Sequence, residues 1–212
     1  MNSSNALSPF LDLRLADCME VMKQYPDHHF DLAIVDPPYG INMGHGAGQN
    51  HRTSDQIIKG DWDKCIPPKE YFEELTRVSK NQIIWGGNYF IDHLRNTKCF
   101  IFWEKTNTKG GHYADGELAW TNFNRVAKMV TLSSMDPSRF HPTQKPVKLY
   151  SWILENFAEK GMKILDTHMG SGSVAIACHY YGAYLTACEI SPEYFEKACE
   201  RIVRETSQLK LF

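Results

Sequence analysis

The sequence lacks the features that would place it in a membrane, secreted or metal-binding class. No apolar run approaches the roughly 20 residues that a membrane span needs, and residues 1–11 have no basic flank before an apolar core. The cysteines are scattered, without a C-x-x-C pair or a histidine spacing that suits zinc: Cys18, Cys65, Cys99, Cys178, Cys188 and Cys199. We therefore expect reduced, mostly buried thiols, no metal, no membrane contact and a cytoplasmic location.

The chain also lacks a surplus of either charge, internal repeats and low-complexity tracts. It has 23 Lys and Arg against 25 Asp and Glu, which excludes a uniformly cationic coat. A nucleic-acid partner would therefore have to meet a local basic face. With 212 residues and 42% hydrophobic content, the sequence predicts a single domain over 1–212, with one sizeable core and no room for a second large domain.

Apolar strand-like runs alternate with helical patterns, which is typical of an α/β sheet with helices on both faces. The predicted strands are Leu11–Leu15, Asp31–Val35, Gln82–Trp85, Cys99–Trp103, Glu117–Trp120, Lys163–Leu165 and Tyr184–Cys188. The predicted helices run from Pro67 and Pro68 to Asn81, from Pro146 to Gly161, from Ser173 to Gly182, and onward from a Ser191 cap followed by Pro192.

A carboxylate follows the second predicted strand, in the segment Asp36-Pro37-Pro38-Tyr39. The carboxyl edge of an open α/β sheet is where ligands bind. The prolines lack backbone donors, so carbonyls and the Asp36 carboxylate remain as acceptors for a substrate amino group. Tyr39 offers a flat face on which an extruded base can stack. On its own the segment also fits a plain strand-ending turn.

A long stretch without periodicity, residues 40–63, follows this motif directly and is predicted to be a mobile loop. It contains His51 and Arg52, which are candidates for contacts with DNA phosphates, although a solvated loop fits equally well. Farther on, Asn88 and Tyr89 follow another strand on the same expected sheet edge. They are weaker candidates for a base pocket.

A second constellation begins at Asp166, which ends a short buried strand and precedes Gly170-Ser171-Gly172 and a helix. A strand, a glycine turn and a helix N-terminus form a nucleotide-type pocket. The next strand ends at Glu189, at about the spacing where an acidic residue receives ribose hydroxyls in dinucleotide-binding folds. A plain βαβ unit remains the alternative, and the glycines do not match the G-x-G-x-x-G of a dehydrogenase.

Together the two constellations resemble the β-class amino-methyltransferases of DNA, in which the Asp-Pro-Pro-Tyr block precedes the cofactor block in a circularly permuted order. The resemblance covers nearly the whole chain. It implies a single Rossmann-like sheet, mostly parallel with one antiparallel strand, that binds S-adenosylmethionine and releases S-adenosylhomocysteine. The segment His141-Pro142-Thr143-Gln144-Lys145-Pro146 is similar to the family's H-x-T-x-K-P.

Residue roles follow from this resemblance. Asp17 would border the cofactor adenine, and Asp166, Gly170 and Gly172 would line the cofactor. Glu189 would hold the ribose, with Thr143, Gln144 and Lys145 near the cofactor carboxylate. The family usually has D-P-F-x-G-S-G-T where this chain has Asp166-Thr167-His168-Met169-Gly170-Ser171-Gly172-Ser173, so His168 replaces an aromatic expected to contact the cofactor.

The implied reaction is one in-line methyl transfer to the N6 amine of a flipped-out adenine in DNA, with Asp36 and the Pro37 carbonyl accepting the amine hydrogens. Cytosine N4 or an RNA base is the alternative target, because the motif recognises an amino group. A catalytically silent nucleic-acid-binding subunit of the same fold is the alternative of another class. The resemblance fits both an orphan methyltransferase and one that is paired with a restriction enzyme.

Sequence specificity has one substantial candidate region, residues 105–139, as a small target-recognition insert. Its Lys105, Lys109 and Arg139 are candidate contacts for phosphates or guanines. Because the region is small, recognition that is short, relaxed or shared across a homodimer stays open.

Overall fold

A computed structural model describes residues 8–43, 62–108, 114–136 and 139–207. Within them a single sheet has the strand order β1-β8-β7-β2-β3-β5-β4-β6. The strands are β1 Leu11–Leu15, β2 Phe30–Val35, β3 Ser79–Trp85, β4 Phe100–Lys105, β5 Gly116–Thr121, β6 Lys128–Leu132, β7 Lys163–Asp166 and β8 Tyr184–Glu189. Only β5 runs antiparallel to its neighbours β3 and β4. The prediction of a mostly parallel sheet with one antiparallel strand is confirmed.

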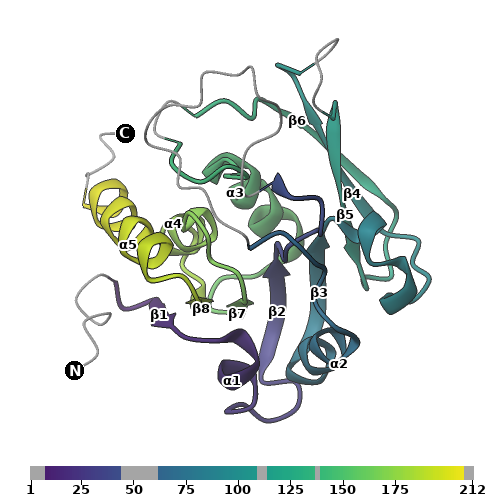
Figure 1. The fold of residues 1–212 in the computed structure, drawn as a ribbon, viewed down its shortest axis with the longest axis horizontal. Coiled ribbons are helices and arrows are strands. Elements are labelled where there is room, and N and C mark those ends of the chain that lie inside the picture. Colours follow the sequence, from purple (N-terminus) through teal and green to yellow (C-terminus); the bar gives the residue numbers. More distant parts are fainter. Residues whose placement is uncertain (1–7, 44–61, 109–113, 137–138, 208–212) are drawn as a thin grey trace.

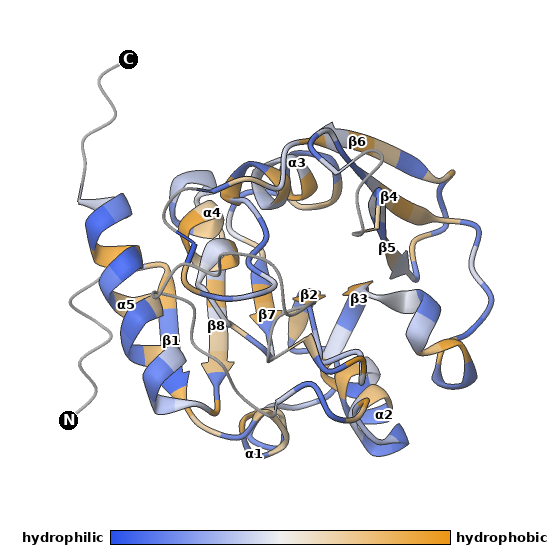
Figure 2. Cartoon of the chain, turned by 45° about the horizontal axis from the view of Figure 1, so that its top comes forward, coloured by the Kyte–Doolittle hydropathy of each residue, from blue (hydrophilic) through white to orange (hydrophobic). Residues whose placement is uncertain are grey.

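Helices cover both faces of the sheet (Figure 1). On one face lie α1 (Cys18–Met22) and α2 (Lys69–Val78); on the other lie α3 (Val147–Phe157), α4 (Ser173–Tyr181) and α5 (Pro192–Thr206). Short 3-10 turns, η3 (Gly87–Tyr89) and η4 (Ile91–His93), follow β3. Apolar residues concentrate in the central strands, whereas the outer side of α5 is polar (Figure 2). A separate buried apolar cluster packs against each face of the sheet.

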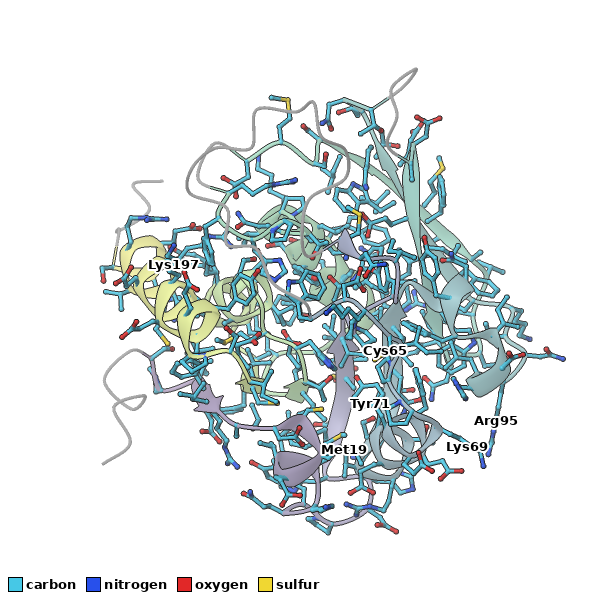
Figure 3. The ribbon with its side chains drawn as sticks, in the orientation of Figure 1. Met19, Cys65, Lys69, Tyr71, Arg95 and Lys197 are labelled. Carbon is cyan, nitrogen blue, oxygen red and sulfur yellow. The ribbon has the colours of Figure 1, made fainter. Side chains whose placement is uncertain are left out.

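The helix signals in the sequence explain most of these elements. Ser191 caps α5 by accepting the Tyr194 N–H at 3.4 Å, and Pro192 occupies the first turn. The apolar stripe of α2 is buried, as its spacing predicts: Tyr71, Phe72, Leu75 and Val78. Tyr71 lies inside the molecule, whereas Lys69 and Arg95 lie at its outer surface (Figure 3).

Two predicted helix ends are wrong. Helix α2 ends at Val78, and the chain passes directly into β3, so Asn81 lies within a strand and donates to the Asp31 carbonyl at 3.2 Å. Helix α3 ends at Phe157, the last apolar residue of its stripe, and Gly161 forms a later turn with φ 80°. Strand β6 was not predicted, because only Val130 in it is buried and an edge strand of this kind shows no apolar alternation.

The sheet brings distant acidic residues to one edge. Strands β2, β7 and β8 are parallel, so Asp36, Asp166 and Glu189 all stand at their carboxyl ends. Between β7 and β2 the strand order reverses direction, and such switch points are where open α/β sheets bind ligands. In the predicted recognition region 105–139, β5 and β6 belong to this sheet. Most of the predicted mobile loop, residues 44–61, lies outside the described residues.

Candidate active site

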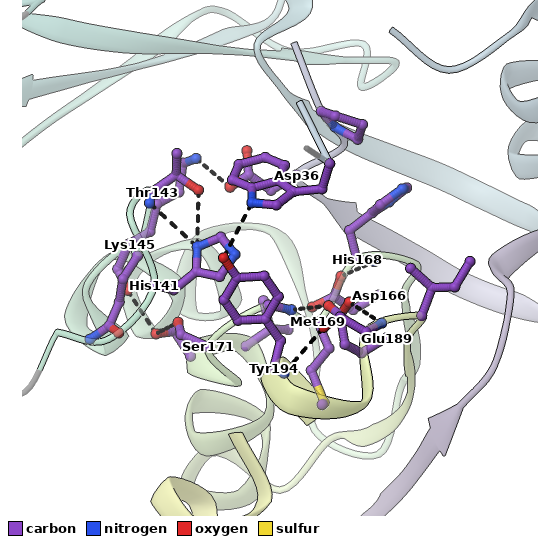
Figure 4. Close-up of a pocket in the computed structure, with 18 of the residues that line it drawn as sticks. Asp36, His141, Thr143, Lys145, Asp166, His168, Met169, Ser171, Glu189 and Tyr194 are labelled. Atoms are coloured by element: carbon purple, nitrogen blue, oxygen red, sulfur yellow. Dashed lines mark hydrogen bonds and ion pairs between the residues drawn. The ribbon is translucent and has the colours of Figure 1, made fainter. Parts of the chain in front are cut away.

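A cavity of about 440 Å³ opens at the switch point and contains residues from both constellations. It is lined by Asp36, Pro38, Trp62, His141, Thr143, Gln144, Lys145, Tyr150, Asp166, His168, Met169, Gly170, Ser171, Ser173, Val174, Glu189, Ile190, Ser191, Glu193 and Tyr194. In Figure 4 His141, Thr143 and Lys145 lie at one side, and Asp166, His168 and Glu189 at the other. The volume is within the about 300–1,000 Å³ of small-molecule sites.

Asp36 is held on both carboxylate oxygens by side chains of this chain. The Tyr39 hydroxyl donates to Oδ1 at 2.5 Å, and Lys145 Nζ donates to Oδ2 at 2.5 Å. Lys145 also lies 3.2 Å from the Tyr39 hydroxyl oxygen. The predicted amine acceptor is therefore already hydrogen-bonded by two side chains.

Lys145 belongs to a charge cluster of alternating sign that also contains Glu117 and Lys105. Its Nζ lies 3.0 Å from Glu117 Oε2, and Lys105 Nζ lies 2.6 Å from Glu117 Oε1. Burial raises the pKa of the Asp36 carboxyl, while the Lys145 charge opposes that rise and the Glu117 charge adds to it. The pKa of Lys145 is raised, because the two carboxylates outweigh the opposing effect of its own burial. Lys145 thus contacts the predicted amine acceptor directly, besides lining the cavity.

The ring of Tyr39 packs within the protein rather than lining the cavity. It stacks on Tyr89 with centroids 4.9 Å apart and an interplanar angle of 14°. It also lies over Gly86, where an added Cβ would be 2.2 Å from Tyr39 Cε1 and where φ is 71°, so only glycine is tolerated there. Of the predicted clamp, Asp36 and Pro38 line the cavity and Pro37 is buried. Asn88 is exposed beside this stack.

Asp63 is a site residue that the sequence did not reveal. Its carboxylate accepts the backbone N–H groups of Tyr39 at 2.6 Å, Gly40 at 2.8 Å and Met43 at 2.8 Å. Asp63 is 2% exposed, and these bonds fix the turn that follows the prolines. No periodicity or motif marks it, because its partners are backbone groups more than 19 residues earlier in the chain.

The cofactor constellation is built around carboxylates that backbone donors orient. Glu189 Oε2 accepts the Gly170 N–H at 3.0 Å and Oε1 accepts the Ser191 N–H at 2.9 Å. Asp166 Oδ1 accepts the His168 N–H at 3.1 Å. Burial raises the pKa of Asp166 to about 8, with the charges of Asp36 and Glu189 adding to the shift. Both carboxyls line the cavity, so their orientation is set before any ligand arrives.

Two predicted cofactor residues are absent from the cavity wall. Gly172 has φ 77°, and an added Cβ would lie 2.9 Å from Ile202 Cδ1, so this glycine serves the packing of the loop on α5. Asp17 caps α1 by accepting the Met19 N–H at 2.8 Å and the Glu20 N–H at 3.3 Å. The Asp17 carboxylate still acts on the cavity electrostatically, because it opposes the lowering of the His168 pKa.

The glycine turn is braced from behind by Arg201 of α5. Its guanidinium donates to the Ser171 carbonyl at 3.0 Å and to the Ser173 hydroxyl at 2.8 Å. Ser173 in turn donates to the Lys145 carbonyl at 2.7 Å, which joins the turn to the segment that carries Lys145. Sequence reasoning missed Arg201, although an arginine beside Ala198 and Ile202 on an apolar helical stripe is a readable signal.

Histidine 141 and Gln144 extend this wall. Burial lowers the pKa of His141 to about 3, and the charges of Lys145 and Arg139 add to the effect. The Thr143 N–H and hydroxyl both lie within hydrogen-bond distance of His141 Nδ1, at 3.3 and 3.2 Å. Gln144 donates to Asp136 at 2.7 Å. These contacts hold the segment rigid, with a neutral imidazole facing the cavity.

Comparison with known proteins decides the family. A family model described as DNA methylase, for N6 and N4 methyltransferases, matches residues 93–200, which are 108 of the 212 residues. The chain belongs to this DNA methylase family. The family's methyl donor is S-adenosylmethionine, and the two-part cavity is consistent with that membership.

Several relatives of this DNA methylase match over most of their length. Type II methyltransferase M2.LlaDCHI of Lactococcus lactis subsp. cremoris is 24% identical, covering 88% of this chain and 87% of that protein. Type II methyltransferase M.HpaI of Haemophilus parainfluenzae is 23% identical, covering 92% and 76%.

Solved structures share the fold of this DNA methylase. The M1.HpyAVI–SAM complex matches with a TM-score of 0.63 and 19% identity, covering 91% of this chain and 98% of that one. The PvuII DNA methyltransferase, cytosine-N4-specific by its name, matches with a TM-score of 0.59 and 11% identity, covering 94% and 92%. At these identities the likeness confirms the fold and does not assign the target base.

Most predicted DNA contacts of this methylase stay untested, and one is placed unfavourably. Lys105 is paired with Glu117 and largely buried. Arg139 donates to the carbonyls of Ser134 and Gln144. His51, Arg52 and Lys109 lie outside the described residues.

The cysteines of the methylase differ in burial. Cys99, Cys178 and Cys188 are buried, whereas Cys65 is exposed. In the described part of the chain, no cluster of three or more His, Cys, Asp or Glu side chains is arranged to hold a metal ion. No helix among those residues is long and apolar enough to cross a membrane.

Proposed function

We propose that this DNA methylase transfers a methyl group from S-adenosylmethionine to the N6 amine of an adenine flipped out of DNA. One observation carries the proposal: Asp36, the acceptor suited to an amine, lines the same cavity as Asp166, Gly170 and Glu189. An amine bound to Asp36 and a ligand held by Glu189 would therefore share one enclosed space. Such positioning supplies much of the rate of a two-reactant reaction.

The cavity residues suit the cofactor in charge and in hydrogen bonding. The Glu189 carboxylate is oriented by the Gly170 and Ser191 N–H groups and retains lone pairs for a ribose diol. Asp166 supplies a second buried carboxyl, which fits a ligand that carries positive charge. When bound, the cofactor supplies an electrophilic methyl group on a sulfonium. The residues that line the cavity are thus an appropriate donor and acceptor set for it.

At the base side, the protein's part is to orient the amine and accept its hydrogens. Asp36 accepts an amine N–H as a carboxylate, a form that the Lys145 ammonium 2.5 Å away favours and that burial and the Glu117 charge oppose. The Tyr39 hydroxyl, which occupies Oδ1, gives way to the amine or rotates with it. As positive charge develops on the nitrogen, the Asp36 carboxylate stabilises it and then takes the released proton.

Adenine is proposed over cytosine because the Asp-Pro-Pro-Tyr form of the motif leans toward adenine in the family that the sequence resembles. The PvuII enzyme, cytosine-N4-specific by its name, shares the fold, so the fold alone does not discriminate. The motif recognises an amino group, and the base identity rests on the resemblance.

The test is to incubate the chain with DNA and methyl-labelled S-adenosylmethionine, digest the DNA to nucleosides and separate them. We expect label in N6-methyladenine. Label in N4-methylcytosine would keep the chemistry and overturn the base. Absence of label from every DNA tried, with S-adenosylhomocysteine still bound, would favour a silent binding subunit.

A matched variant tests the role of Asp36 in the same assay. Asp36→Asn keeps the shape but removes the carboxylate, so methyl transfer should fall about 10²–10⁴-fold. Binding of S-adenosylhomocysteine, measured by calorimetry, should change only a few-fold. Undiminished methyl transfer by this variant would remove Asp36 from the mechanism.

A further inference from the structure

Behind the cavity wall, three side chains form a hydrogen-bonded relay that ends on His168. The Tyr71 hydroxyl of α2 lies 2.6 Å from Thr167 Oγ1, and Thr167 Oγ1 lies 2.9 Å from His168 Nδ1. Tyr71 is 1% and Thr167 3% exposed, whereas the His168 ring lines the cavity. Tyr71 also meets the imidazole edge to face, with centroids 5.4 Å apart. The relay therefore connects the buried side of α2 to a ring that a ligand can touch.

Counting protons assigns a direction to this relay. In the described part of the chain, Thr167 Oγ1 is the one hydrogen-bond partner of the Tyr71 hydroxyl, so Tyr71 donates to it. If Thr167 Oγ1 also accepted from His168, its own buried proton would have no acceptor among the described residues, so Thr167 donates to His168 Nδ1, which must then be unprotonated. The reverse direction would leave the buried Tyr71 proton without an acceptor, which is the costly arrangement. His168 consequently carries its proton on Nε2.

The relay depends on residues that depart from the pattern of the family. Where Pro and an aromatic usually follow the aspartate, this chain has Thr167 and His168. Proline has no hydroxyl to relay a proton, and an aromatic hydrocarbon ring has no N–H to donate. Burial lowers the pKa of His168 to about 4, which keeps the ring neutral at physiological pH. The substitutions together convert a packing contact into a donor of fixed direction.

We propose that His168 is a cofactor-specificity residue whose Nε2–H donates to an acceptor nitrogen of the cofactor's adenine ring, with Tyr71 and Thr167 as the positioning residues that fix this tautomer. The inference rests on the proposed function for the presence of an adenosine group in the cavity. The adenosine half is the relevant one because His168 stands with Asp166 and Glu189, at the side of the cavity opposite Lys145 (Figure 4).

The tautomer is tested by nitrogen NMR of the chain with ¹⁵N-labelled histidine. We expect the His168 signals, identified by their absence in His168→Phe, to show protonated Nε2 and unprotonated Nδ1. Thr167→Val should mix the tautomers, because it removes the donor to Nδ1. Thr143→Val is the matched control for the tautomer alone, since the Thr143 backbone N–H still donates to His141 Nδ1. Protonated Nδ1 on His168 in the native chain would overturn the relay.

The ligand contact is tested by calorimetry with S-adenosylhomocysteine and its 1-deaza, 3-deaza and 7-deaza adenine analogues. One analogue should bind the native chain about 3- to 10-fold more weakly, which corresponds to one net hydrogen bond. The same analogue should show no loss relative to the parent on His168→Phe. Thr167→Val should weaken the parent compound, whereas Thr206→Val, a distant Thr of α5, should not.

The outcomes separate this inference from the proposed function. If all three analogues bind as tightly as the parent, or if His168→Phe shows the same loss as the native chain, His168 is only a packing substitute and the inference fails. The proposed transfer of a methyl group to DNA would still stand after that result. If the native chain does not bind S-adenosylhomocysteine at all, the proposed function fails and the inference with it.

Discussion

The two halves of the cavity differ in how their carboxylates are satisfied. On the base side, both oxygens of Asp36 are taken by side chains, Tyr39 and Lys145, and the nearest charges form a cluster. On the cofactor side, Glu189 is held by backbone N–H groups and faces the cavity. Protein donors leave lone pairs on both carboxylates, so the two halves differ in the mobility of those donors. Backbone N–H groups fix the carboxylate of the cofactor half, whereas the donors of the base half are side chains that can rotate or exchange.

This difference implies different sensitivities. Substitutions on the base side should change turnover and its pH dependence, because they alter the charge state of Asp36. Substitutions on the cofactor side should change affinity and the protons that accompany binding.

Among the variants that keep Asp36, Lys145→Met should have the largest effect, a fall in turnover of about 10²-fold at neutral pH. Removal of the ammonium leaves Asp36 and Glu117 as neighbouring buried carboxyls, so the pKa of Asp36 rises further above its ordinary value. Activity that needs the carboxylate is lost as pH falls through that pKa, so the acid limb of the pH–rate profile should move to higher pH. Steady-state rates across pH measure this.

A second variant keeps that prediction testable if Lys145→Met folds poorly, because breaking a buried ion pair can destabilise by about 3–5 kcal/mol. The double variant Lys145→Met with Glu117→Gln removes the like charge, so the acid limb should return part of the way. An acid limb that is the same in native and single-variant proteins would show that Lys145 does not control Asp36.

Asp63→Ala should lower turnover by about 10-fold and destabilise the fold by about 1–3 kcal/mol. Three backbone N–H groups, those of Tyr39, Gly40 and Met43, lose their acceptor. The turn that places Tyr39 then loosens, while Glu189 and its donors stay in place. Thermal unfolding and calorimetry with S-adenosylhomocysteine measure the two effects, and Asp115→Ala at an exposed site is the control. A loss of affinity as large as the loss of turnover would contradict the contrast.

The sequence could predict features that depend on neighbouring residues, but not contacts between residues far apart in the chain. Local signals identified the strands other than β6, the Ser191 cap and the carboxylates at strand ends, because each depends on residues close in the chain. The partners of Asp36 were beyond reach. Lys145 lies 109 residues away, and Glu117 stands on a strand whose neighbours only the sheet order defines. Lys145 was accordingly predicted as a cofactor residue near Thr143, and its contact with Asp36 appeared only in the structure.

The raised pKa of Asp166 predicts that a proton is released when the cofactor binds. That pKa is raised to about 8 by burial, so below pH 8 the unliganded protein holds much of this carboxyl protonated. A cationic ligand in the cavity favours the carboxylate, so binding should release up to one proton between about pH 6 and 8. Calorimetry in buffers of different ionisation enthalpy measures it. Asp166→Asn should abolish the release.

The pH dependence of the unfolding temperature is a second test of the raised Asp166 pKa. A carboxyl whose folded pKa exceeds its unfolded value of 3.8 destabilises the fold progressively as pH rises from 3.8 to about 8. Asp166→Asn should therefore raise the unfolding temperature of the unliganded protein at pH 9 relative to native, and much less at pH 4. An equal effect at both pH values would mean that Asp166 titrates normally.

The smallest expected effect is that of Lys105→Gln on DNA binding. A lysine that neutralises a phosphate contributes about 0.9 to the slope of log affinity against log salt. Lys105 is instead 2.6 Å from Glu117 and lies over the Trp103 ring, so its charge is already used inside the protein. The salt slope, measured by fluorescence anisotropy with duplex DNA, should therefore stay unchanged, while turnover falls only a few-fold through Glu117. A slope reduced by about 0.9 would return Lys105 to the DNA interface and would move β4 and β5 from the support of the base side to its recognition surface.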